Sequence, residues 1–399
     1  MPAPARSAPI SAVDPFCAEF FADPYPHHAA MRDAGPVVFL ERYSIFGMAR
    51  HADVSAALTD WQTYSSASGV GIDDFRKKKP WRPASILLEV DPPLHTRTRT
   101  VMARILSIGA MRKLRAEFEG KAEALIGAVV AKKRFDAIEE IAKTYPLLVF
   151  PDAVGLRPEG RENLLPFGNM VFNSFGPPNR FFHDSIKAAE PVVAWINAQC
   201  ARDMLSADGF GAEVYKALDA GEITAGEAPI LVRSMLTAGL DTTVNGIGSA
   251  IYAFAQNPEQ WARLHADPSL ARAAFEEVIR FEAPVQTFFR TTTRDVEIDD
   301  VKIPEGEKVL LFLGAANRDP RRWENADSFD ITRKTAGHTG FGVGIHGCVG
   351  QMVARLEGEL VLAALARRVE TLRIIGEPVR HFNNTLRSLA RLEVEVEAA

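Results

Sequence analysis

FGVGIHGCVG, residues 341–350, is the most informative segment of this 399-residue chain. It is a glycine-rich loop, and its Cys348 lies two residues before a segment of strong helical periodicity that begins at Gly350. The N-terminus of a helix presents unpaired N–H groups and the positive end of the helix dipole, which favour a thiolate over a thiol. Glycines also let the backbone approach a flat macrocycle closely. The loop is therefore suited to hold Cys348 as a thiolate against such a ligand.

Cys348 taken alone has other interpretations. A lone cysteine in a glycine-rich turn is more often a buried structural thiol. A zinc site of His338, His346 and Cys348 is a weaker hypothesis, because the last two are only two positions apart and no fourth ligand has suitable spacing. A cysteine nucleophile is weaker too, since no oxyanion-hole or orienting-group signature accompanies it. Motifs elsewhere in the chain are needed to choose between these roles of Cys348.

The composition is that of an ordinary globular protein, with 47% hydrophobic and 24% charged residues. A net charge of -5 and a pI near 6.0 argue against nucleic acid as a partner. The three cysteines are too few and scattered for a disulfide framework, which favours a reducing cytoplasm. The apolar stretch 230–254 contains Arg233 and Asp241, so it predicts a buried central helix and not a membrane span.

The pattern along the chain predicts one mostly helical domain over 14–399 after a disordered segment at 1–13. Residues 37–50 are typical of two short strands, and residues 295–313 of a hairpin that turns near Asp299 and Asp300. Helical periodicity predicts helices over about 110–131, 228–256, 268–282 and 350–369.

Three further motifs precede the cysteine loop. Glu277-Val278-Ile279-Arg280 places a carboxylate and a guanidinium on one helix face. Ala238-Gly239-Leu240-Asp241-Thr242-Thr243 interrupts an apolar helix, where the glycine and the threonine hydroxyls favour a local kink. His95-Thr96-Arg97-Thr98-Arg99 follows Asp91-Pro92-Pro93 and offers donors for an anion. Each motif alone could also be an ordinary structural feature, either a set of solvated surface charges or the polar face of a helix.

These motifs, in this order over nearly the whole chain, resemble the cytochrome P450 family. The resemblance implies a mostly α prism with small β-sheets, in which haem b lies between the oxygen-activation helix and the helix after the thiolate loop. It implies that Cys348, in the loop with Phe341 and Gly342, is the axial ligand of the haem iron, and that Thr242 and Asp241 relay protons to dioxygen. It also implies that Glu277 and Arg280 form a buried structural pair, and that the haem propionates are held by His95, Arg99, Arg290 and His346.

Other segments resemble the bacterial subgroup of this family that oxidises para-substituted benzoates. They are residues 80–85 (PWRPAS), residues 172–179 (FNSFGPPN) and Arg233-Ser234. By this resemblance Leu88, Phe172, Phe175, Val285 and Phe288 are expected to form apolar walls, and Arg82, Ser85, Arg233 and Ser234 the anionic end, with Thr237 and Ala238 also near the substrate. Arg82 also fits a solvated basic loop after Lys77–Lys79, and the three phenylalanines also fit a core.

Two positions depart from the subgroup. Ala84 stands where relatives often carry proline, and Thr237 where they often carry serine, so the preferred para substituent is left open. The resemblance implies, as one case, O-demethylation of 4-methoxybenzoate to 4-hydroxybenzoate and formaldehyde.

Electrons are expected from an external [2Fe–2S] ferredoxin, its reductase and NADH, because the sequence has no flavin or iron–sulfur motif. Basic residues such as Arg97, Arg104, Arg112, Lys113 and Arg355 are candidates for the docking face, although a solvated surface is an equal alternative. Rival hypotheses are oxidation of another aromatic acid or a neutral terpenoid, a peroxide-driven peroxygenase, and a non-catalytic haem sensor or electron carrier.

Overall fold

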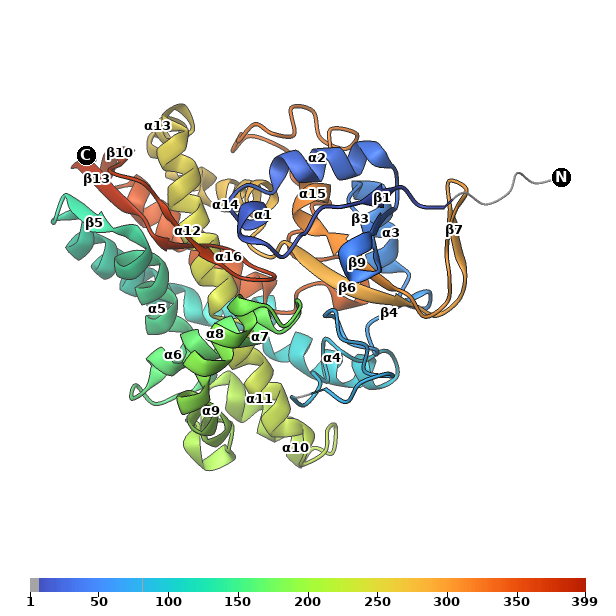
Figure 1. The fold of residues 1–399 in the computed structure, drawn as a ribbon. Coiled ribbons are helices and arrows are strands. Elements are labelled where there is room, and N and C mark those ends of the chain that lie inside the picture. Colours follow the sequence, from blue (N-terminus) through green and yellow to red (C-terminus); the bar gives the residue numbers. More distant parts are fainter. Residues whose placement is uncertain (1–6, 81) are drawn as a thin grey trace.

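The fold combines a large helical part with a smaller β-rich part, in a computed structural model that describes residues 7–80 and 82–399 (Figure 1). The helices before the chain's centre are α1 (Ala18–Ala22), α2 (Tyr25–Ala34), α3 (His51–Thr59), α4 (Leu94–Ile105), α5 (Ile108–Val130), α6 (Thr144–Val154), α7 (Leu164–Asn173), α8 (Arg180–Ala189) and α9 (Val193–Gln199). Those that follow are α10 (Phe210–Asp219), α11 (Glu227–Ala238), α12 (Asp241–Gln256), α13 (Pro258–Ala266), α14 (Ala271–Phe281), α15 (Leu313–Asn317) and α16 (Gln351–Ala366).

The largest sheet has the strand order β1-β2-β3-β9-β6-β4 and lies beside the helical part, on the right in Figure 1. Its strands are β1 (Ile10–Ser11), β2 (Val38–Leu40), β3 (Ile45–Met48), β4 (Tyr64–Ser65), β6 (Thr287–Thr292) and β9 (Lys308–Phe312). The smaller sheets contain β7 (Val296–Ile298) with β8 (Val301–Ile303), β11 (Val379–Phe382) with β12 (Arg387–Arg391), and β5 (Arg134–Asp136) with β10 (Val369–Ile374) and β13 (Glu393–Ala398).

Several expected elements are confirmed. Residues 37–50 form β2 and β3, and β7 and β8 form the expected hairpin. Its turn residues Asp299 and Asp300 have φ angles of 45° and 67°, as a tight turn matched to the twist of a hairpin requires. The helices expected over 110–131 and 350–369 are α5 and α16.

Two boundaries differ from the expectation. The N-terminal segment expected to be disordered includes Ile10 and Ser11, which form β1 and pair with β2; its residues 1–6 lie outside the described residues. The helix expected over 268–282 begins as a 3-10 turn, Pro268–Leu270, because Pro268 cannot continue the preceding helix, and α14 follows it.

The central helix expected over 228–256 is divided into α11 and α12. The break lies at Gly239 and Leu240, where Phe150 of α6 packs so closely that a Cβ on Gly239 would lie 2.4 Å from its ring. The Thr242 hydroxyl donates to the Ala238 carbonyl over 2.8 Å, and the Thr243 hydroxyl to the Gly239 carbonyl over 3.1 Å. These contacts are the physical cause of the expected kink.

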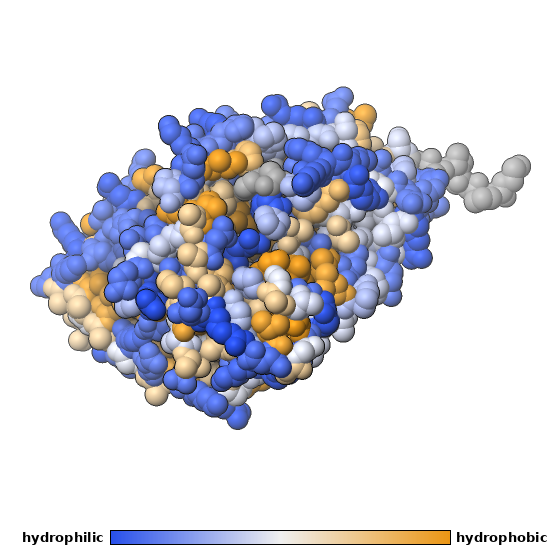
Figure 2. Space-filling model, turned by 90° about the horizontal axis from the view of Figure 1, so that it is seen from below, coloured by the Kyte–Doolittle hydropathy of each residue, from blue (hydrophilic) through white to orange (hydrophobic). Residues whose placement is uncertain are grey.

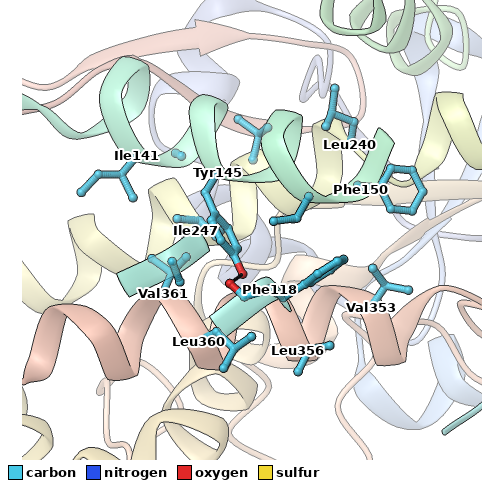
Figure 3. Close-up of a cluster of buried hydrophobic side chains, with 14 of the residues drawn as sticks. Phe118, Ile141, Tyr145, Phe150, Leu240, Ile247, Val353, Leu356, Leu360 and Val361 are labelled. Atoms are coloured by element: carbon cyan, nitrogen blue, oxygen red, sulfur yellow. Dashed lines mark hydrogen bonds between the residues drawn. The ribbon is translucent and has the colours of Figure 1, made fainter. Parts of the chain in front are cut away.

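The main hydrophobic core fixes α12 and α16, the two helices that flank the site. Figure 3 shows Phe118 of α5, Tyr145 of α6, Ile247 of α12 and Leu360 of α16 meeting in one buried cluster. The Tyr145 hydroxyl donates to the Phe118 carbonyl over 3.0 Å, so its polar atom is satisfied inside the core. Each buried side chain of this size contributes about 1.5–3 kcal/mol, so the core resists displacement of either helix.

The outer surface seen from below is mostly hydrophilic, and hydrophobic residues form separate patches on it (Figure 2). Among residues 7–80 and 82–399, no helix is long and apolar enough to cross a membrane.

Candidate functional site: a thiolate loop facing a buried cavity

The loop around Cys348 is built as the sequence predicts. The Cys348 N–H donates to the Phe341 carbonyl over 2.7 Å, which closes the loop just before α16. Gly344 has a φ of 71°, and a Cβ there would lie 2.6 Å from the Leu58 carbonyl oxygen. Glycine is therefore required at this position by both backbone conformation and space.

The Cys348 sulfur faces opposing electrostatic influences. Burial raises the pKa of the thiol, whereas the N–H groups of Gly350 and Gln351 and the charges of Arg99 and Arg355 act to lower it. Binding to a metal ion would remove the proton, because thiolate is the ligating form. Burial is the stronger influence, so the pKa of the thiol is raised overall, and the sulfur needs a cationic partner to become a thiolate.

A cavity of about 480 Å³ extends from Cys348 past α11 and α12. Its walls include nearly every residue predicted from the sequence to contact a cofactor or substrate: Arg82, Ser85, Leu88, Arg99, Phe172, Phe175, Arg233, Ser234, Thr237, Ala238, Thr242, Val285, Phe288, Arg290, Phe341, Gly342, His346 and Cys348. Trp81, in the segment 80–85, lies outside the described residues. Residues more than 260 positions apart in the sequence therefore meet around one space.

Four donors gather beside the thiolate loop: Arg99, Arg290 and His346 line the cavity, and His95, which is absent from its walls, contacts His346. The rings of His95 and His346 lie 4.4 Å apart, and His95 Nε2 and both His346 nitrogens are buried without a hydrogen-bond partner among the described residues. Arg290 is buried, and its only side-chain hydrogen bond within the described residues goes to the Phe289 carbonyl; burial lowers its pKa to about 10. Burial likewise lowers the pKa of Arg99. Unpaired buried donors are costly, so the set calls for an anionic ligand.

These observations fit haem. A flat macrocycle would lie against the glycine-rich loop with Cys348 as iron ligand, and its two propionates would satisfy the donors of His95, Arg99, Arg290 and His346. The zinc hypothesis finds no such support: His338 contacts Glu276 over 2.9 Å, and the described residues contain no group of three metal-ligating side chains.

Glu277 and Arg280 form a buried ion pair behind the loop. Both side chains are 0% exposed, and the two joining N–O distances are 2.7 Å. Arg280 also donates to the carbonyls of Asn317, Ala326 and Ser328, and Arg333 donates to Glu277 over 3.2 Å. The pair therefore ties α14 to the segment that leads into the thiolate loop.

Thr242 and Asp241 point in different directions. Thr242 lines the cavity, whereas Asp241 is absent from its walls and lies against Gly168 of α7, where a Cβ would be 2.6 Å from Asp241 Oδ2. Burial raises the pKa of Asp241 to about 8, an effect that Lys143 partly opposes. Asp241 is thus held protonated at neutral pH, next to the cavity but outside it.

The predicted apolar walls come together in one cluster on the cavity wall. The rings of Phe172 and Phe175 are 5.9 Å apart and nearly perpendicular, and Phe288 of β6 lies 5.7 Å from Phe175. Leu88 and Val285 pack against the same cluster. The arrangement leaves a slot lined by aromatic faces and edges.

The polar groups near this slot are not equivalent. Arg82 is paired with the fully buried Glu89 through two contacts of 2.8 Å, so its charge is compensated. Arg233 is half-buried, burial lowers its pKa, and its guanidinium has no hydrogen bond or ion pair to any other part of the chain that the structure describes. Arg233 is therefore the free cation of this end of the cavity.

The hydroxyl groups also differ. Ser234 and Thr237 donate to the carbonyls of Ile230 and Arg233 over 2.8 Å, within α11. Ser85 Oγ instead accepts from the Leu88 N–H over 3.1 Å, which leaves its own proton for a ligand. Ser85 is thus the more available donor to an anion.

Sequence reasoning missed two carboxylates. Glu89 compensates Arg82, and Asp91 accepts from Ser65 and lies 3.9 Å from His346. A single charge between the apolar residues Leu88 and Val90 could have indicated that Glu89 is buried.

The basic residues considered for a docking face differ in their surroundings. Arg97, Arg104 and Arg355 pair with Glu227, Glu222 and Glu276, whereas Arg112 and Lys113 are exposed.

Comparisons with known proteins agree with this geometry. A sequence profile of the family described as cytochrome P450 matches residues 198–394. Cytochrome P450 CYP199A2 of Rhodopseudomonas palustris is 57% identical over 98% of this chain and 95% of its own length. Cytochrome P450 107B1 of Saccharopolyspora erythraea is 35% identical over 77% of this chain and 76% of its own length.

Solved structures show the same fold. Cytochrome P450 CREJ in complex with (4-ethylphenyl) dihydrogen phosphate superposes with a TM-score of 0.87 at 26% identity, covering 96% of this chain and 99% of its own. CYP109Q5 from Chondromyces apiculatus superposes with a TM-score of 0.82 at 29% identity, covering 97% of this chain and 98% of its own. With its thiolate loop, donor set and fold, this chain belongs to the cytochrome P450 family of haem-dependent monooxygenases.

Proposed function

We propose that this cytochrome P450 oxidises para-substituted benzoic acids, for example by O-demethylation of 4-methoxybenzoate. The observation that carries the proposal is the free Arg233 guanidinium in a cavity that is otherwise mainly apolar and that extends to Cys348. A benzoate has a flat apolar ring and one charged end, which matches this distribution.

The spacing along the central helices supports the same orientation. Arg233 of α11 lies nine positions before Thr242 of α12, and both residues line the cavity. A carboxylate bound by Arg233 and Ser85 would leave the para substituent directed toward Thr242 and the haem side of the cavity. The rings of Phe172, Phe175 and Phe288 would hold the ring between these ends.

Haem bound through Cys348 supplies the reductive activation of O2 and the insertion of one oxygen atom into a C–H bond. The chain's own residues place the substrate and manage protons. The Thr242 hydroxyl, now bonded to the Ala238 carbonyl, would hold a water molecule for proton delivery. The buried, protonated Asp241 would replenish that proton once its side chain turns from Gly168 toward the cavity.

The O-demethylation of 4-methoxybenzoate balances in atoms and electrons. The methoxy C–H bond is replaced by C–OH, with O2, two electrons and two protons consumed and one water released. The resulting hemiacetal breaks its C–O bond to give formaldehyde and 4-hydroxybenzoate.

One solved structure of the family supports the substrate class. The CREJ complex contains (4-ethylphenyl) dihydrogen phosphate, a para-substituted aromatic ring with an anionic group. We further propose that the electrons come from NADH through a reductase and a [2Fe–2S] ferredoxin, for which the exposed Arg112 and Lys113 offer positive charge.

The proposal is tested by an optical titration of the haem-loaded protein. We expect 4-methoxybenzoate and other para-substituted benzoates to displace the water on the iron and shift it to high spin. The neutral isostere 4-methoxybenzamide serves as a matched control and is expected to bind far more weakly. A shift produced by neutral terpenes but not by the benzoates would overturn the proposal.

A further inference from the structure

Glu89 is the residue whose surroundings the proposed function leaves unexplained. It follows the loop 82–88, which lines the cavity, yet Glu89 itself is absent from the cavity walls and its side chain is 0% exposed. Burying a carboxylate lowers the stability of the fold unless the charge is fully paired. A buried carboxylate next to a ligand cavity is therefore a candidate for a functional role.

The contacts of Glu89 bind the loop into one unit. Its two carboxylate oxygens accept from the two terminal nitrogens of Arg82 over 2.8 Å each, and Oε2 also accepts from the Ser85 N–H over 2.8 Å. Arg82 in turn lies over the Phe175 ring, with its guanidinium carbon 5.4 Å from the ring centroid. Glu89 therefore fixes an arginine, a serine and an aromatic wall of the cavity at once.

The charges at this end of the cavity add up to a single positive one. Arg82 and Arg233 lie close enough for their charges to interact, and both line the cavity. The negative charge of Glu89 cancels that of Arg82, so Arg233 supplies the net charge that a ligand encounters. A site with one excess positive charge favours a monoanion over a neutral ligand, and it offsets the larger desolvation cost of a second negative charge less fully than a site with two positive charges would.

We propose that Glu89 is a positioning residue that determines the charge specificity of the cavity. By neutralising Arg82 it sets the net charge of the anion-binding end at +1, so that the cavity selects monocarboxylates. This inference rests on the proposed function and assigns its charge selectivity. Glu89 acts through Arg82 and Ser85 and does not contact the substrate.

The test compares three ligands that differ at one end only: 4-methoxybenzamide, 4-methoxybenzoate and 4-methoxyphenylphosphonate, at a mildly alkaline pH where they carry zero, one and two negative charges. Their dissociation constants are measured by spin-state titration of the haem-loaded protein and of Glu89→Gln. One additional positive charge in a partly buried site strengthens binding by about tenfold per ligand charge. We therefore expect both the phosphonate-to-benzoate and the benzoate-to-benzamide affinity ratios to rise about tenfold.

Ratios separate the charge effect from damage to the loop, because a disordered loop weakens all three ligands together. The double variant Arg82→Gln/Glu89→Gln restores the net charge and is expected to restore the wild-type ratios. Should Glu89→Gln fail to incorporate haem, Arg82→Gln carries the same test with the opposite sign, about a tenfold fall in both ratios. Glu395→Gln removes the same charge from the ion pair with Arg134 that joins β13 to β5, far from α4 in Figure 1, and is expected to change neither ratio.

The outcomes are distinguishable. Ratios that stay at wild-type values in Glu89→Gln, while the wild-type protein binds 4-methoxybenzoate, would overturn this inference and leave the proposed function intact. A wild-type protein that binds neither anion would overturn both.

Discussion

Replacing Arg233 with methionine tests whether this residue binds the carboxylate of the substrate. Methionine keeps much of the length of the side chain but removes the only unpaired cation that the described residues place at this end of the cavity. Truncating one partner of a buried charge pair costs about 2–5 kcal/mol. Arg233 is half-buried, so we place the expected loss at the lower end, about 2–3 kcal/mol, which is a factor of about 30–150 in the dissociation constant of 4-methoxybenzoate.

The assay is a spin-state titration with 4-methoxybenzoate and 4-methoxybenzamide side by side. The amide has no charge to lose, so its affinity should change by less than about 1 kcal/mol. Arg97→Met is the matched control, because Arg97 pairs with Glu227 on the surface and should leave both affinities unchanged. Equal losses of affinity for acid and amide in Arg233→Met would show that Arg233 contributes packing and does not recognise the carboxylate charge.

Three further predictions concern the oxygen side and the scaffold. Thr242→Ala should retain haem and substrate binding but divert electrons to hydrogen peroxide, measured as peroxide formed per NADH consumed; unchanged coupling would remove Thr242 from proton delivery. An ordinary aspartate has a pKa near 4, so the raised pKa of Asp241 means that the folded protein keeps a proton that the unfolded chain loses as pH rises from about 4 to about 8. The free energy of unfolding should therefore fall by about 1.4 kcal/mol per pH unit in this window relative to Asp241→Asn, as followed by chemical denaturation, and parallel pH profiles would contradict it. Arg280→Met should lower the free energy of unfolding by about 3–5 kcal/mol, because Glu277 would remain buried without its main partner; a loss below about 1 kcal/mol in the same assay would show that the pair is dispensable.

Local patterns predicted much of this fold. The tight turn at Asp299 and Asp300, the helix after Cys348 and the kink near Gly239 each depend on residues a few positions apart, and all are present. The division into α11 and α12 was less accessible, because the break also depends on the ring of Phe150, which is distant in sequence.

The sequence predicted which residues line the cavity but not the net charge of its anion-binding end. Resemblance to a family brought Arg82 and Arg233 into the same set, and the structure places both on the cavity wall. Only the fold shows that Glu89 compensates one of them and not the other, since ion pairing depends on side-chain contacts that spacing does not determine. The direction of the Asp241 side chain, toward Gly168 and away from the cavity, is likewise a property of packing.

Product analysis is the decisive test of whether the protein O-demethylates 4-methoxybenzoate. The haem-loaded protein is supplied with a [2Fe–2S] ferredoxin, its reductase, NADH and 4-methoxybenzoate in air, and formaldehyde and 4-hydroxybenzoate are quantified against the NADH consumed. We expect both products in equal amounts and close to one of each per NADH, with neither formed when hydrogen peroxide replaces NADH and the ferredoxin system. NADH consumption that yields peroxide alone, or turnover of a neutral terpene in preference to the acid, would contradict it.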